Sequence, residues 1–310
     1  MKKKILILIL CVSLITCFGC NNVKKEDNSK KIVTSFYPVY IFTKNLTNGI
    51  DDVTVTNITQ QTGGCLHDYT LLPKDLVLLN DASLFIINGA GMESFMKKVS
   101  DQLPELPVVT ASEGIDLIFS EHHHHEDEEE KHDTADKHKT AYNAHVWLSV
   151  PNAITEVENI AKVLKKTLPD DAKKIETNKQ NYIKRLTALD SQLKQELSAF
   201  KGTPIITFHE AYGYFAIQYD LLIIDTIETE DGNEPSAKEL SELSQKVKTA
   251  GVTALFVEPQ YKGNSANILA SETGAKVYTL NPITSGADSL TAYEDIMKSN
   301  LKVFKEALGG

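Results

Sequence analysis

Short apolar runs alternate with amphipathic stretches along most of the chain. Ile32–Phe36 is one such run, and Pro38 separates it from a helix-like segment. Two more runs, within Ala82–Gly91 and Val252–Gln260, follow helical stretches and end in loops that contain Gly or Pro. Runs of this length predict buried strands. Strands that alternate with helices indicate a parallel α/β sheet.

The same order of elements occurs twice. Lys31–Leu46 and Pro204–Leu221 each begin with an apolar strand, continue through Ser-Phe or Thr-Phe, and end in an aromatic-rich helix. The repeat predicts an α/β fold of two similar lobes, each a mainly parallel sheet flanked by helices.

A long charged segment, residues 170–200, lies between the two halves. Its apolar side chains recur mostly every three or four positions, at Ile175, Tyr182, Ile183, Leu186, Leu189, Leu193 and Leu197. This spacing predicts a helix of about 30 residues and about 45 Å. We expect it to join an N-terminal lobe, residues 31–169, rigidly to a C-terminal lobe, residues 201–310. An ordinary amphipathic surface helix is the alternative.

The start of the chain indicates export. Three lysines precede the apolar run Ile5–Ile15, which is short for a bilayer span, and the pattern predicts a signal peptide over residues 1–20. The segment ends in CFGC, which resembles a bacterial lipoprotein signal with Cys20 as the lipidated residue, although Cys17 stands where Leu is usual. An ordinary signal peptide cleaved nearby is the alternative. Residues 21–30 are polar and predict a tether.

Net charge and cysteine content limit the kinds of partner and of covalent cross-link that we expect. The chain has 310 residues and a net charge of −10, which argues against a nucleic-acid partner. Of its four cysteines, Cys11 and Cys17 would leave with the signal peptide and Cys20 would be lipidated. Cys65 then remains alone, so we expect no disulfide framework.

The nine histidines fall into two groups. His67, His145 and His209 each stand at an expected strand end or loop start, where open α/β sheets place their ligands. The other six lie in the acidic segment 121–138, at His122, His123, His124, His125, His132 and His138. The sequence contains neither an HExxH motif nor a P-loop, so it offers no sign of a zincin or nucleotide site.

Eight segments resemble, in order, the zinc-binding lipoproteins that serve as substrate-binding subunits of bacterial metal-uptake ABC transporters. They are VTSFYPVYIF, HDYTLLPKDL, ASLFIINGAGMESFM, HVWLS, TFHEAYGYFAIQY, EPSAKEL, FVEPQ, and LNPI followed by YEDIMKSN. The resemblance covers nearly the whole mature chain. It implies two α/β lobes joined by one long helix, with the metal held between them by His67 and His145 of the first lobe and His209 of the second.

The resemblance also implies a function. The protein would capture zinc outside the membrane and deliver it to an ABC permease driven by a separate ATPase. It would be a lipid-anchored monomer and not an enzyme. Zinc-type relatives often carry a His- and acid-rich insertion before the HVW segment, and residues 121–138 match it. Imidazoles and carboxylates suit a zinc-collecting loop, and a solvated linker with incidental histidines is the alternative.

The choice of metal follows from the third ligand position. Manganese-type relatives place a carboxylate there, whereas this chain has His209, and three imidazoles favour zinc over manganese. The fourth ligand stays open: water, Asp288 or a loop histidine would complete the site. Cys65 could in principle offer a thiolate, but we interpret it instead as a small residue tolerated in a Gly-rich turn. A manganese or broader divalent-metal protein of the same transporter class is the alternative.

Two other acidic residues near these motifs have structural interpretations. Ser236 and Glu239 have the spacing of a capping box at a helix start, next to Glu234. Glu258 ends a predicted strand, where it would accept a hydrogen from a ligand histidine.

Two rival functions have their own signatures. A zinc hydrolase would use an open fourth position to activate water, with Glu210 or Asp68 as the nearest bases in sequence. A surface adhesin would bind its partner even with the three histidines replaced.

Overall fold

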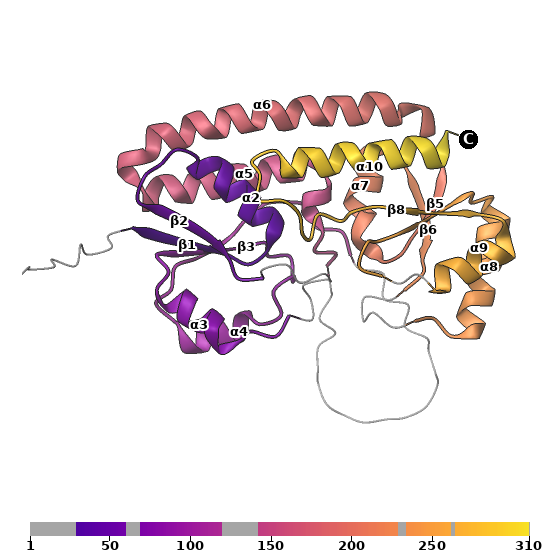
Figure 1. The fold of residues 1–310 in the computed structure, drawn as a ribbon, viewed down its shortest axis with the longest axis horizontal. Coiled ribbons are helices and arrows are strands. Elements are labelled where there is room, and N and C mark those ends of the chain that lie inside the picture. The colour runs from indigo at the N-terminus through magenta and orange to yellow at the C-terminus, as the bar shows by residue number, and fades with distance from the viewer. Residues whose placement is uncertain (1–28, 60–68, 120–141, 229–233, 262–263, 310) are drawn as a thin grey trace, which may run out of the picture.

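The computed structural model describes residues 29–59, 69–119, 142–228, 234–261 and 264–309. Two four-stranded sheets form two lobes, and one layer of helices lies along both (Figure 1). The predicted fold class is therefore confirmed. Residues 1–28, most of the expected signal and tether, lie outside the described residues, as do Cys65, His67 and the histidine-rich segment.

The first sheet has the strand order β2-β1-β3-β4, and every pairing is parallel. Its strands are β1 (Lys30–Thr34), β2 (Val53–Asn57), β3 (Leu84–Ile87) and β4 (Val108–Thr110). All four residues of β3 are buried, as expected for a central strand covered by helices on both faces.

The second sheet repeats this order as β6-β5-β7-β8, again with parallel pairing. Its strands are β5 (Pro204–Thr207), β6 (Leu222–Thr226), β7 (Ala254–Val257) and β8 (Lys276–Thr279). The first strand of each half is thus central in its sheet. The repeat that is visible in the sequence corresponds to two sheets of the same topology.

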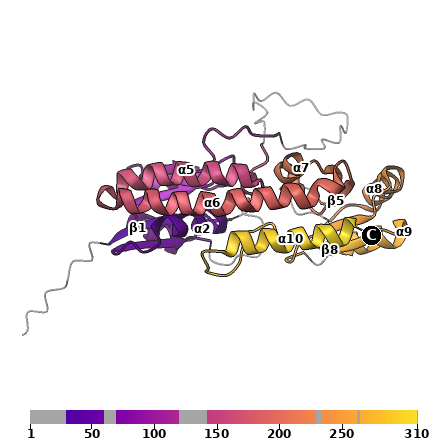
Figure 2. The ribbon, with the colours of Figure 1, turned by 90° about the horizontal axis from the view of Figure 1, so that it is seen from above.

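Helices cover both faces of each sheet (Figures 1 and 2). The shared layer contains α2 (Tyr37–Thr47), α5 (Val150–Thr167), α6 (Ala172–Leu197), α7 (Gly213–Tyr219) and α10 (Ala292–Leu308). On the opposite faces lie α3 (Pro73–Asn80) and α4 (Met96–Gln102) in the first lobe, and α8 (Ala237–Ala250) and α9 (Asn264–Thr273) in the second. Single 3₁₀ turns are η2 (Val146–Leu148), η3 (Pro169–Asp171), η4 (Ser198–Phe200) and η5 (Glu210–Tyr212).

The long helix α6 connects the lobes, as predicted, and 3₁₀ turns flank it at both ends. At 1.5 Å per residue its 26 residues extend about 39 Å. Arg185 of α6 bonds to two neighbouring helices: its Nη2 lies 2.6 Å from Asn45 Oδ1 of α2, and its Nε lies 2.8 Å from Glu294 Oε1 of α10. The helix therefore contacts α2 of the first lobe and α10 of the second.

The largest hydrophobic core extends through this layer from one lobe to the other. It includes Ile32 and Trp147 of the first half and Ile205 and Phe256 of the second. Smaller cores lie on the far face of each sheet, around Phe85 in the first lobe and Leu255 in the second. Because one core serves both lobes, they form a single packed unit. Among the described helices, none is long and apolar enough to cross a membrane.

Candidate metal site

His145 and His209 meet between the lobes. His145 immediately precedes η2, and His209 follows β5 and precedes η5. Both are buried, with 0% and 4% of their surfaces exposed. Their Nε2 atoms lie 3.2 Å apart, and their rings are inclined at 69°. The structure thus brings together two of the three predicted site histidines.

The separation of the two Nε2 atoms suits one tetrahedral metal ion. Zinc–imidazole bonds of 2.0–2.1 Å at a tetrahedral angle place two nitrogens about 3.3–3.4 Å apart. The observed 3.2 Å is close to that value. When each ring carries its hydrogen on Nδ1, the two Nε2 lone pairs face each other at this distance and repel, and the arrangement then favours a cation between them.

The segment that carries His145 is held from several sides. The indole of Trp147 donates from Nε1 to Pro282 O at 2.8 Å, and Tyr293 Oη donates to Trp147 O at 2.7 Å. Phe36 packs edge-on against the Trp147 ring, with centroids 4.7 Å apart. The HVW motif therefore forms a rigid turn whose aromatic side chain enters the core next to His145.

A side-chain amide lies behind His145. Asn143 Oδ1 accepts from the backbone N–H of His145 at 2.9 Å and lies 3.0 Å from the ring nitrogen Nδ1. Asn143 Nδ2 donates to the carbonyl oxygen of Glu210 at 2.6 Å. With Nδ1 turned to an acceptor, the other ring nitrogen, Nε2, points toward His209.

A carboxylate lies behind His209. Glu258 follows β7 directly, only 3% of its surface is exposed, and its Oε1 lies 2.5 Å from His209 Nδ1. Gln260 Nε2 donates to the other carboxylate oxygen at 2.6 Å. The predicted pairing of Glu258 with a site histidine is confirmed. Metal-binding imidazoles usually have such a partner, which orients the ring and raises its basicity.

Glu228 is a second acidic neighbour of His209, and the sequence showed little sign of it. It lies two residues beyond β6 and is buried, with 4% of its surface exposed. Burial raises its pKa to about 7, with a further increase from Glu234 and Glu258, while His209 lowers it. Glu228, Glu234 and Glu258 thus form an acidic group beside His209. The only sequence signal was the density of acids in TIETEDGNE, after an apolar strand.

The structural interpretation of the EPSAKEL segment is confirmed. Ser236 Oγ accepts from the Glu239 backbone N–H at 3.3 Å, and Glu239 Oε2 accepts from the Ser236 N–H at 2.7 Å. This capping box begins α8. Glu234 accepts a hydrogen bond from Ser265 Oγ of α9.

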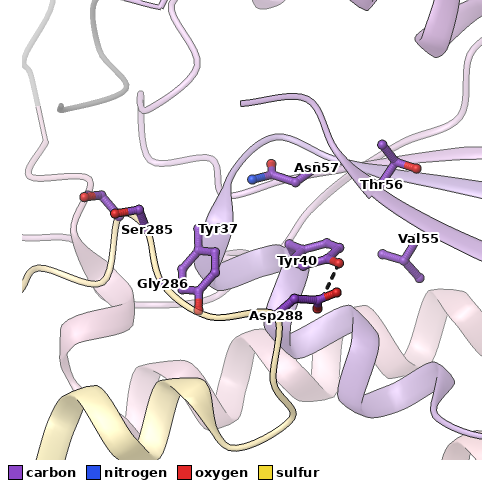
Figure 3. A pocket seen from close by; sticks show the side chains of 9 residues that line it. Tyr37, Tyr40, Val55, Thr56, Asn57, Ser285, Gly286 and Asp288 are labelled. Atoms are coloured by element: carbon purple, nitrogen blue, oxygen red, sulfur yellow. Dashed lines mark hydrogen bonds between the residues drawn. The ribbon is translucent and has the colours of Figure 1, made fainter. Parts of the chain in front are cut away.

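Asp288, one of the candidates for a fourth ligand, lies at the surface with 62% of its side chain exposed. Its Oδ1 pairs with Lys44 Nζ at 2.5 Å and accepts from Tyr40 Oη at 3.1 Å. These partners lower its pKa, Lys44 most strongly. The residue borders an open cavity of about 510 Å³ between α2, the end of β2 and residues 284–288 (Figure 3). Asp288 thus ties the second lobe to α2, and its partners there are Lys44 and Tyr40 rather than the site histidines.

Within the residues that the structure describes, no cluster of three or more His, Cys, Asp or Glu side chains is arranged to hold a metal ion. His145 and His209 supply two donors, and the predicted third, His67, lies outside the described ranges. Glu210, the base next to His209 in sequence, lies in η5, and its backbone carbonyl oxygen accepts a hydrogen bond from Asn143 Nδ2.

Two parallel-sheet lobes that share a helical layer, with an imidazole from each lobe meeting between them, define a two-lobed binding protein with a metal-suited donor pair. The chain matches the family described as "Zinc-uptake complex component A periplasmic" over residues 32–307, and it belongs to that family. The family is an extracytoplasmic, solute-binding transport component and not an enzyme family.

Curated relatives agree with this assignment. The zinc-binding lipoprotein AdcA of Streptococcus pneumoniae is 32% identical over 98% of this chain, which spans 61% of that protein. The high-affinity zinc uptake system protein ZnuA of Bacillus subtilis is 32% identical, with 97% of this chain and 96% of that protein covered.

Solved structures show the same fold. A crystal structure of ZnuA has a TM-score of 0.76 at 28% identity and covers 90% of this chain and 99% of that one. The Zn(II)-bound ZnuA-like domain of S. pneumoniae AdcA has a TM-score of 0.73 at 29% identity, with 91% and 100% covered. The laminin-binding protein Lmb of Streptococcus agalactiae, described as bifunctional with adhesin and metal-transporting activity, has a TM-score of 0.75 at 25% identity, with 90% and 100% covered.

Proposed function

We propose that this protein captures zinc outside the cell membrane and hands it to an ABC-type permease driven by a separate ATPase. The observation that carries the proposal is the pair of buried Nε2 atoms, 3.2 Å apart and contributed by different lobes. His67 would be the third ligand, entering from the segment after β2. Water is the fourth ligand we favour, since Asp288 is paired with Lys44.

The donor set supports zinc as the cargo. Imidazole nitrogens suit zinc, whereas manganese prefers oxygen-rich sites. The partners behind the two rings are a neutral amide and a carboxylate, which hold both imidazoles in one orientation. The Zn(II)-bound AdcA domain, with its similar fold, agrees with this assignment.

The parts outside the described residues complete the proposal. Residues 1–20 would direct export, and lipidated Cys20 would anchor the protein, as the name of the lipoprotein relative suggests. The histidines at 122–125, 132 and 138 would collect zinc without forming the site for the transported metal. The chain would act as a monomer.

Calorimetry on metal-stripped protein that lacks residues 1–20 tests the proposal. We expect one tight zinc site that disappears in His145→Ala and in His209→Ala, with much weaker manganese binding. A variant with the six segment histidines replaced by Ala should keep this tight site. Tight binding that survives both single substitutions would refute the inter-lobe site.

An adhesin role is the second candidate, because the similar Lmb structure is described as having both activities. Binding of laminin-coated surfaces by the wild type and by the His145→Ala/His209→Ala double variant separates the two functions. Equal and specific adhesion by both proteins would establish an adhesin role independent of the metal. No adhesion by either would leave zinc uptake as the sole proposal.

A further inference from the structure

Asn143 forms hydrogen bonds near both site histidines. Its side-chain oxygen accepts from the backbone N–H of His145 and also faces the ring nitrogen Nδ1. Its side-chain nitrogen donates to the backbone carbonyl of Glu210, the residue after His209. Only 3% of its surface is exposed. His145 belongs to the first lobe and Glu210 to the second, so one buried amide connects both halves of the proposed site.

We infer that Asn143 is a positioning residue for zinc, which sets the tautomer of His145 and ties it to the strand end that carries His209. The inference rests on the proposed function, since it assigns a role at the same site. Asn143 itself would not touch the metal.

Two backbone groups determine the orientation of the amide. The His145 N–H can only donate, so it must face Oδ1, and the Glu210 carbonyl can only accept, so it must face Nδ2. Oδ1 then accepts from the ring as well, so the hydrogen of His145 must be on Nδ1. Nε2 is thereby left as the metal-binding nitrogen.

The cross-lobe bond is part of a tight contact. Tyr214 Oη donates to Asn143 O at 2.8 Å and accepts from the Ile118 N–H at 3.1 Å. A Cβ on Gly213 would lie 3.3 Å from Asn143 Nδ2 and 2.8 Å from Ile118 Cδ1. Glycine at the start of α7 thus lets that helix approach the Asn143 segment. Movement of one lobe against the other here would break the 2.6 Å bond to Glu210 and separate the two imidazoles.

Two substitutions separate the two roles. Asn143→Ala removes both the tautomer control and the link between lobes. Asn143→Asp keeps an oxygen for the His145 N–H groups, but its second oxygen would face the Glu210 carbonyl and repel it. Asn159→Ala is the matched control, because Asn159 Nδ2 also donates to two backbone carbonyls, those of Ala111 and Glu113, each at 2.8 Å.

The test is zinc affinity by chelator competition on the full mature chain, with Co²⁺ absorption as a probe of ligand geometry and thermal unfolding of the metal-free protein as a stability control. Removing the partner of a ligand histidine typically costs 10–100-fold in metal affinity, so we expect a loss of about that size in Asn143→Ala. In Asn143→Asp the added carboxylate raises the basicity of His145 while the broken link opposes binding, so we expect a smaller change in zinc affinity than in Asn143→Ala, together with a clear loss of thermal stability. Both variants should change the Co²⁺ spectrum, and Asn159→Ala should change only stability.

Asn143→Ala with an affinity within about threefold of wild type would overturn the inference. Asn143→Asp with the same thermal stability as wild type in the metal-free state would overturn the link between lobes. Both outcomes are interpreted only if His145→Ala abolishes tight zinc binding. If His145→Ala keeps tight binding, the proposed zinc site fails. If His145→Ala loses it but the Asn143 variants do not, only the positioning role of Asn143 fails.

Discussion

Replacement of Glu258 should weaken zinc binding without any loss of a metal ligand. Its carboxylate lies 2.5 Å from His209 Nδ1, and both residues are buried. Glu258→Ala removes the negative charge that orients the imidazole and raises its basicity. Glu258→Gln keeps an oxygen of similar reach but removes the charge.

The magnitude follows from the type of contact. A hydrogen bond to a charged group contributes about 1.5–3 kcal/mol, which corresponds to roughly 10–150-fold in a binding constant. Loss of the partner of a metal-ligating histidine typically costs about 10–100-fold. We therefore expect Glu258→Ala to raise the dissociation constant for zinc about 10–100-fold, and Glu258→Gln to have a smaller effect.

Competition with a calibrated zinc chelator at neutral pH measures the change. Glu272→Gln removes the same charge at an exposed position of α9 and should leave affinity unchanged. Thermal unfolding of each metal-free protein verifies that it is folded. Equal zinc affinity in wild type and Glu258→Ala would refute the assigned contact, and an equal loss in the Glu272 control would point to overall charge.

Four further predictions follow from other parts of the molecule. Zinc affinity should fall as pH decreases through the histidine range, because protons compete for the Nε2 atoms, and calorimetry across pH 5–8 would detect this. The pKa of Glu228 is raised from 4.5 to about 7, so between these pH values the Glu228 carboxyl binds more protons in the folded metal-free protein than in the unfolded chain. The free energy of unfolding of the wild type, relative to that of Glu228→Gln, should therefore fall as pH rises from 4.5 to about 7. The same pH dependence of unfolding free energy in both proteins would contradict the raised pKa. Gly286→Ala would place a Cβ 2.4 Å from Tyr37 Oη, so we expect a loss of about 1–3 kcal/mol in urea unfolding, partly relieved by adding Tyr37→Phe. Arg185→Met leaves the buried Glu294 carboxylate without its cation and should cost about 1.5–3 kcal/mol, and an unchanged melting temperature would show that this pair contributes nothing.

The elements with a uniform pattern were predictable from sequence. The apolar runs of β1, β3, β5 and β7 indicated central strands, and regular apolar spacing indicated α6. Edge strands were harder to recognise. Strand β2 has the sequence VTVTN, and none of its five residues is fully buried, so it lacks the apolar run that marks its neighbour.

The site was predictable only in part, for a physical reason. His145 and His209 are recognisable because imidazoles at strand ends suit a metal. The residues behind them are not, because their roles depend on contacts across the fold. Asn143 meets the Glu210 carbonyl 67 positions away, and Glu228 is significant only because folding buries it near His209. In the sequence both resemble ordinary polar loop residues.

The uninterrupted core between the lobes bears on how a membrane partner would recognise a loaded protein. Wide separation of the lobes would expose part of that core, and each roughly 400 Å² of apolar surface costs about 10 kcal/mol. The metal-free and zinc-bound forms must then have nearly the same overall shape. A bound divalent cation adds two positive charges to a chain whose net charge is −10. A transporter would therefore sense occupancy through local charge and a few side chains around the histidines, and not through a change of overall shape.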